Sequence, residues 1–127
     1  MRRPVLLDSS FLIALEREST LSQHGPARRF LPALGGRRLV VSVVTVAELL
    51  EGAIDEAAAL AALQRFLILG LHLAQAERCA RLQRRSARRF GENDAWLVAT
   101  ALSIDADVVG CDRKAFERLG ARYLKFQ

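Results

Sequence analysis

The chain has 127 residues, of which 51% are hydrophobic and 26% are charged. This composition excludes an intrinsically disordered chain, and no apolar run approaches the roughly 18 residues of a membrane span, so we expect a soluble, cytoplasmic protein with one domain over residues 1–127. All but two of the 19 basic residues are arginine and the formal net charge is +5, which favours a polyanionic partner.

Apolar runs of strand length alternate along the chain with segments of helical period. The runs lie at 5–7, 37–42, 66–71, 106–110 and 122–126, and helices are expected at about 9–17, 26–34, 43–53, 56–65, 73–89, 93–104 and 113–119. Apolar strands separated by helices are typical of a parallel sheet covered on both faces. The pattern predicts an α/β fold with a central parallel sheet of about five strands, and the more alternating last run is expected at an edge.

The first isolated acid is Asp8, in the stretch PVLLDSSFLIAL. It follows the first predicted strand and precedes the first predicted helix, between two apolar segments. One interpretation is that Asp8 or Ser9 caps the helix by accepting a free backbone N–H. The other is that Asp8 holds a metal ion.

Three further acids stand in similar contexts, and each has a structural alternative. Glu48 lies in VVTVAELLEGA, where Thr45 and Glu48 also fit a capping box. In GENDAWLVATAL, Asn93 or Asp94 could cap the helix expected to begin at Ala95. Asp112, in VVGCDRKAF, could cap the short helix beyond the fourth strand.

Taken together, the four acids point to a shared site at one edge of the sheet. The carboxyl ends of parallel strands emerge at the same edge, where open α/β sheets bind ligands. Carboxylates gathered there would repel, because two unit charges 4 Å apart cost about 4 kcal/mol at an effective dielectric of 20. Oxygen ligands without His or Cys suit a hard ion, so the pattern predicts Mg²⁺ or Mn²⁺.

Other acids compete less well for this site. Glu51 shares a helix face with Glu48, so on residue pattern alone it remains a competing ligand. Asp105 and Asp107 flank a helix end and a strand start, and we interpret them as ordinary turn acids.

A basic face is predicted on the helix at 73–89. At 100° per residue its arginines fall on one arc, opposite small residues: Arg78, Arg81, Arg84, Arg85, Arg88 and Arg89. A charge run is often only a solvated surface, yet six like charges without interspersed acids repel one another. We therefore take Arg81, Arg85 and Arg88 as candidates for binding RNA phosphates.

Four stretches in this order resemble the PIN-domain ribonucleases, in particular the VapC-type toxins of bacterial toxin–antitoxin pairs. They are LLDSSFLIAL, VVTVAELLEG, NDAWLVATAL and the Asp of VVGCDRKAF, and the resemblance covers essentially the whole chain. It implies an endoribonuclease dependent on Mg²⁺ or Mn²⁺, with Asp8, Glu48, Asp94 and Asp112 as catalytic and metal-binding residues. Glu48 is preferred to Glu51 because it follows Ala47 and precedes Gly52 by four.

The resemblance also implies a mechanism and partners. Water activated by the bound metal would attack an RNA phosphodiester, with no protein nucleophile. Family members usually form homodimers, and a cognate antitoxin closes the acidic site with a peptide that often carries a basic residue. The sequence departs from the family at Gly110, where many members have Thr or Ser, and Ser9 is a candidate for the missing hydroxyl.

Two other functions are compatible with the residues. One is a non-catalytic RNA- or protein-binding module on the same fold. The other is a cation-dependent phosphotransfer domain, which would need a lysine at the acidic edge, and Lys114 is the candidate.

Overall fold

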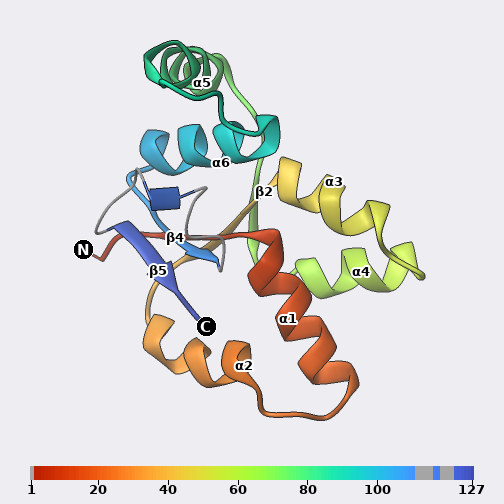
Figure 1. Cartoon of the computed structure of the whole chain (residues 1–127). Coiled ribbons are helices and arrows are strands. Elements are labelled where there is room, and N and C mark those ends of the chain that lie inside the picture. The colour runs from red at the N-terminus through yellow and green to blue at the C-terminus, as the bar shows by residue number, and fades with distance from the viewer. Residues whose placement is uncertain (1, 111–115, 118–121) are drawn as a thin grey trace.

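The structure is a computed structural model that describes residues 2–110, 116–117 and 122–127 (Figure 1). Its strands form one five-stranded sheet in the order β3-β2-β1-β4-β5, and every neighbouring pair is parallel. They are β1 (Val5–Leu7), β2 (Leu39–Ser42), β3 (Leu67–Leu69), β4 (Asp107–Gly110) and β5 (Tyr123–Lys125). The predicted α/β fold is confirmed, and β5 lies at an edge as expected.

Helices cover both faces of the sheet, as Figure 1 shows, with α5 and α6 on one side and α1 and α2 on the other. They are α1 (Ser9–Thr20), α2 (Pro26–Phe30), the 3₁₀ turn η1 (Leu31–Leu34), α3 (Val43–Glu51), α4 (Glu56–Leu63), α5 (Leu73–Arg85) and α6 (Glu92–Ser103). The predicted helix at 26–34 is therefore divided into α2 and η1. Of the helix predicted at 113–119, only residues 116–117 lie within the described residues.

The side chains of β1 alternate between two hydrophobic cores. Val5 and Leu7 pack with α1 and α2 on one face, while Leu6 packs with α6 on the other. All three are fully buried, which explains why the strand is a continuous apolar run. The central position of β1 places the residue that follows it, Asp8, in the middle of the carboxyl edge.

Helix α5 is shorter than the predicted helix at 73–89, because the chain leaves the helix at Ser86. Ser86 has an extended backbone, and its hydroxyl donates to the Leu82 carbonyl (2.5 Å). The Gln83 side chain then holds the backbone of Phe90 through two hydrogen bonds, of 2.9 and 3.2 Å. Burial of the Phe90 ring beside α5 and α6 requires this turn, which the helical periodicity did not reveal.

No helix among the described residues has both the length and the apolar character that crossing a membrane requires.

Candidate acidic active site

Asp8 is fixed by the backbone at the carboxyl end of β1. Its N–H donates to the Val109 carbonyl of β4 (2.9 Å), and its extended backbone makes it the N-cap position of α1. Its side chain makes no capping hydrogen bond with α1, all of whose residues are described. The interpretation of the Asp8 carboxylate as a helix cap is therefore wrong, although the side chain is only 8% exposed.

The surroundings of the Asp8 carboxylate include a hydroxyl and a bare glycine. Ser10 donates from its hydroxyl to Asp8 Oδ2 (2.8 Å), whereas Ser9 had been the candidate hydroxyl. Gly110, at the end of β4, approaches so closely that a Cβ built there would lie 3.1 Å from Asp8 Oδ2. The glycine that departs from the family pattern thus leaves room for Asp8 between β1 and β4.

Glu48 projects from the second turn of α3. That helix begins with Ser42 as its N-cap, whose hydroxyl accepts from the Val44 N–H (3.1 Å). Thr45 is thus inside the helix, so the proposed Thr45–Glu48 capping box is wrong. Glu48 therefore has no capping role, and it lies half-buried at the carboxyl edge of the sheet.

Asp94 lies in the first turn of α6. This helix begins at Glu92 with Gly91 as its N-cap, three residues earlier than an Asp94 cap would require. The Asp94 carboxylate turns back toward Gly91, where a Cβ would lie 3.4 Å from Asp94 Oδ2. A carboxylate in the first turn is stabilised by the helix dipole.

The charges of Asp8 and Asp94 act on Glu48, which raises its pKa. Burial is the largest cause, followed by the negative charge of Asp8, and the charges of Asp94 and Glu51 add to it. A hydrogen bond with the Asn93 side chain works in the opposite direction. Asp8 and Asp94, which come from two other segments, therefore lie close enough to disfavour the ionisation of Glu48.

A shallow hollow of about 380 Å³ opens beside these carboxylates. Its lining comes from α3 and from the start of α6: Glu48, Gly91, Glu92, Asn93 and Asp94. Glu51 is exposed and does not line it, so the geometry favours Glu48 over the competing acid.

The donor set matches a hard divalent cation in chemistry and charge. Carboxylate oxygens are the ligands that Mg²⁺ and Mn²⁺ prefer, and a cation would relieve the repulsion that raises the Glu48 pKa. Among the described residues, no three acidic, His or Cys side chains are already close enough to hold a metal ion. Asp112, the fourth predicted ligand, and Lys114 lie outside the described residues.

The interpretation of Asp105 and Asp107 as ordinary turn acids is wrong for Asp107. Asp107 is the first residue of β4, is 8% exposed and forms an ion pair with Arg37. Asp105 does lie in a turn, where it pairs with Arg122. Both acids sit at the amino ends of the strands, the opposite edge from Asp8.

The predicted basic face is divided between two structural elements. Arg81 and Arg85 lie on α5 and are exposed, and Arg81 pairs with Glu77 (3.2 Å). Arg88, which is also exposed, lies beyond the helix in the segment that leads to the start of α6. The basic residues therefore continue from α5 toward the Asp94 end of the hollow.

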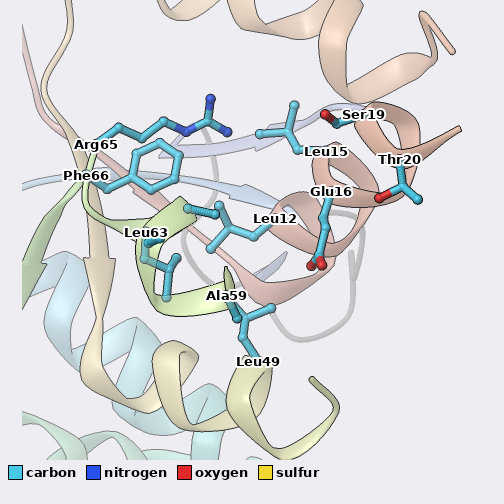
Figure 2. A pocket seen from close by; sticks show the side chains of 12 residues that line it. Leu12, Leu15, Glu16, Ser19, Thr20, Leu49, Ala59, Leu63, Arg65 and Phe66 are labelled. Carbon is cyan, nitrogen blue, oxygen red and sulfur yellow. The ribbon is translucent and has the colours of Figure 1, made fainter. Parts of the chain in front are cut away.

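A second, more apolar groove adjoins the acidic hollow. One part of it, about 350 Å³, is lined by residues that include Glu48, Ile13 and Leu49. The next part, about 360 Å³ and shown in Figure 2, lies between α1, α3 and α4 and shares Leu49 with the first. Glu16 also lines both parts, so the two adjoining parts form a mainly apolar groove that carries acids at Glu16 and Glu48.

Sequence reasoning missed Ser10, and it treated Asn93 only as a possible helix cap. The spacing of Ser10, two residues after Asp8, is a known pattern for a local side-chain hydrogen bond and could have revealed it. The contact of Asn93 with Glu48 joins segments 45 residues apart and has no local signal.

Comparisons with known proteins agree with this geometry. The family model of the PIN domain matches residues 5–122, and comparison with curated proteins gives no match. A chain of a toxin–antitoxin complex from Klebsiella pneumoniae is 24% identical, with 97% of this chain and 98% of that chain covered and a TM-score of 0.79.

Two further solved structures are similar. A chain of VapBC-1 from nontypeable Haemophilus influenzae is 24% identical, with 96% of this chain and 97% of that chain covered and a TM-score of 0.72. VapC20 from Mycobacterium tuberculosis, described as a toxin that cleaves the sarcin-ricin loop, is 21% identical, with 91% and 95% covered and a TM-score of 0.69. The predicted resemblance to VapC-type toxins is confirmed in the fold.

Proposed function

This chain belongs to the PIN-domain family, and we propose that it is a divalent-cation-dependent endoribonuclease and the toxin of a bacterial type II toxin–antitoxin pair. The observation that carries the proposal is the mutual influence of Asp8, Glu48 and Asp94 at the carboxyl edge of the sheet. Acids that gather in this way need a cation or protons to offset their repulsion.

In this proposal Asp8, Glu48 and Asp94, together with Asp112, hold Mg²⁺ or Mn²⁺ and are the catalytic residues. When bound, the ion lowers the pKa of a water and offsets the charge that develops on the scissile phosphate. The carboxylates orient the ion against the sheet edge, and the open hollow beside Glu48 admits the RNA backbone. No protein side chain is required as a nucleophile.

The replacement Asp8→Asn tests the enzymatic function. We expect it to abolish cleavage of total RNA in Mg²⁺ or Mn²⁺, as chelation by EDTA should, because it removes a charged oxygen ligand from the centre of the site. Glu56→Gln, an exposed acid on α4, is the matched control and should cleave like the wild type. Cleavage that survives both EDTA and Asp8→Asn would contradict the proposal, and RNA binding without any cleavage would favour the non-catalytic binding module.

The exposed arginines that lead from α5 to the hollow are proposed to bind RNA phosphates. The exposed side chains provide positive charge that attracts phosphates whatever the base sequence, which suits contacts with the RNA backbone; they are those of Arg81, Arg85 and Arg88. Replacing all three by Ala should weaken RNA binding. It should also make the slope of log affinity against log salt concentration shallower, by an amount that corresponds to the loss of up to about three phosphate contacts. An unchanged salt slope in a filter-binding titration would contradict this role.

We also propose that the groove of Figure 2 receives the cognate antitoxin. The groove is mainly apolar and carries acids at Glu16 and Glu48, so it fits an amphipathic segment that bears basic residues. Ile13 and Ala62 line it and are exposed. Ile13→Arg with Ala62→Arg should abolish co-purification of the coexpressed antitoxin while Mn²⁺ binding is retained; undiminished co-purification would exclude the groove.

A homodimer is proposed through the β3 edge of the sheet. The segment 67–73 carries no charge, and it exposes Leu67 (45%), Ile68 (41%) and Leu73 (75%) beside the open edge of β3. An uncharged apolar edge favours pairing with an identical edge of a second copy. Leu73→Glu should yield a monomer in light scattering, whereas Leu21→Glu, on an exposed residue remote from this edge, should not; a dimer in both variants would exclude the β3 edge.

A further inference from the structure

Ser10 restrains the Asp8 carboxylate from the first turn of α1. Its hydroxyl donates to Asp8 Oδ2 at 2.8 Å, and the carboxylate is 8% exposed. A buried carboxylate that accepts a hydrogen bond keeps one orientation more strictly than a solvated one. Ser10 is uncharged, so it restrains Asp8 without supplying a positive charge that would compete with a cation.

Gly110 restricts Asp8 from the side of β4. A Cβ at position 110 would lie 3.1 Å from Asp8 Oδ2 and 3.2 Å from Asp8 Cβ, so a side chain there would push against the carboxylate. The bare backbone of Gly110 therefore lets Asp8 occupy this position, while Ser10 provides the hydroxyl from the first turn of α1. Asp8 is held between the two.

Asn93 plays a similar part for Glu48. It is the second residue of α6, and it lines the same hollow as Glu48 and Asp94. Its side chain is hydrogen-bonded to Glu48, and α3 and α6 are in direct contact across the site. This contact joins an amide at the start of α6 to a carboxylate of α3, so it restricts the orientation of Glu48 within the hollow.

We propose that Ser10 and Asn93 are positioning residues, which hold Asp8 and Glu48 in the arrangement that a divalent cation binds. The inference rests on the proposed function, since it assumes that these carboxylates are the metal ligands. Uncharged hydrogen-bond donors around ligating carboxylates fix the ligands before the ion arrives, and their loss commonly lowers metal affinity by about 10- to 100-fold. Neither residue touches the reacting phosphate in this proposal.

The first test compares two adjacent serines by calorimetric titration of the protein with Mn²⁺. Ser10→Ala should weaken Mn²⁺ binding by about tenfold or more, and Ser10→Thr, which keeps the hydroxyl, should restore most of the affinity. Ser9→Ala is the matched control and should bind as the wild type does, because Ser10 is the residue whose hydroxyl donates to Asp8 Oδ2. Equal Mn²⁺ affinity in folded Ser10→Ala and Ser9→Ala would overturn the role of Ser10.

The second test is a double-mutant cycle at Glu48. Asn93→Ala should weaken Mn²⁺ binding by about tenfold and Asn93→Gln should weaken it less, while Gln64→Ala, an exposed amide in the turn directly after α4, should have no effect. In the background of Glu48→Gln, Asn93→Ala should cause no further loss, because Asn93 acts through that carboxylate. Additive losses would overturn the role of Asn93.

The same titrations separate this inference from the proposed function. If the wild type binds Mn²⁺, the variants weaken it and no RNA is cut, the proposed nuclease function fails while the positioning roles are supported. If RNA is cut and the Ala variants bind Mn²⁺ as the wild type does, the positioning roles fail alone. If the wild type binds no Mn²⁺, both are overturned.

Discussion

The two edges of the parallel sheet surround their carboxylates in opposite ways. At the amino edge, Asp107 pairs with Arg37 and lies 3.6 Å from Arg3, while Asp105 pairs with Arg122. At the carboxyl edge, Glu48 is surrounded by other carboxylates and by the neutral Asn93. Acidic side chains therefore serve structure at the amino edge, whereas at the carboxyl edge they are the proposed ligands of a cation.

The pKa directions express this difference. A hydrogen bond with Arg122 is the largest cause that lowers the pKa of Asp105. Burial and the charge of Asp8 raise the pKa of Glu48. The folded protein thus stabilises the ionised form of Asp105, whereas the ionisation of Glu48 opposes folding.

The largest expected effect is at the amino edge, in Arg37→Met. Both side chains of the Arg37–Asp107 pair are nearly buried, at 11% and 12% exposure, so removal of Arg37 leaves a buried charge with a weaker partner. We expect the free energy of unfolding, measured in urea, to fall by about 3 kcal/mol. Arg38→Met, at the exposed neighbouring position, is the control, and an equal loss in both variants would contradict the assigned role of the pair.

A smaller effect of opposite sign is expected at the carboxyl edge, in Glu48→Gln. In the absence of divalent ions the variant should be as stable as the wild type or more stable at neutral pH, because it removes a charge that opposes folding. The usual Glu pKa is 4.5, and the folded value is raised. The contribution of protonated Glu48 is therefore fully present below the usual pKa and is lost as the pH rises through the folded pKa.

Thermal unfolding across that pH range measures the difference. The stability advantage of Glu48→Gln over the wild type should grow as the pH rises, and added Mn²⁺ should stabilise only the wild type. Glu51→Gln, on the same helix but outside the hollow, should keep the response to Mn²⁺. A loss of stability in Glu48→Gln as large as that in Arg37→Met would remove the contrast between the two edges.

The smallest effect is expected for Asp105→Asn. Asp105 is 71% exposed and has a positive φ of 53°, which Asn also tolerates, so the change removes little besides the charge. Because the folded pKa is lowered, its contribution is present above the usual value of 3.8 and is lost as the pH falls through the folded value. We expect a slight decrease in melting temperature at neutral pH, and a smaller decrease in high salt. A decrease in melting temperature that persists at acid pH would show that Asp105 has another role.

The sequence-based prediction was strongest where the pattern is local. The continuous apolar run at 5–7 and its alternation with helical segments predicted the parallel sheet. The role of Asp8 and Glu48 at its carboxyl edge stays a prediction. The prediction was wrong about the end of α5, because Gln83 and Phe90 stop the helix through contacts that periodicity does not describe. It also missed the ion pair of Asp107 with Arg37, which joins residues 70 positions apart.

By itself, the sequence determined that buried parallel strands alternate with helices and that acids follow those strands, because hydrophobic period and charge position are properties of neighbouring residues. Only the tertiary structure decided which acids share a site and which are neutralised. That decision depends on the strand order, which brings Asp8, Glu48 and Asp94 to one edge and directs Arg3, Arg37 and Arg122 to the other. Electrostatic interactions act through space, so the same carboxylate is structural or functional according to the segments that folding places beside it.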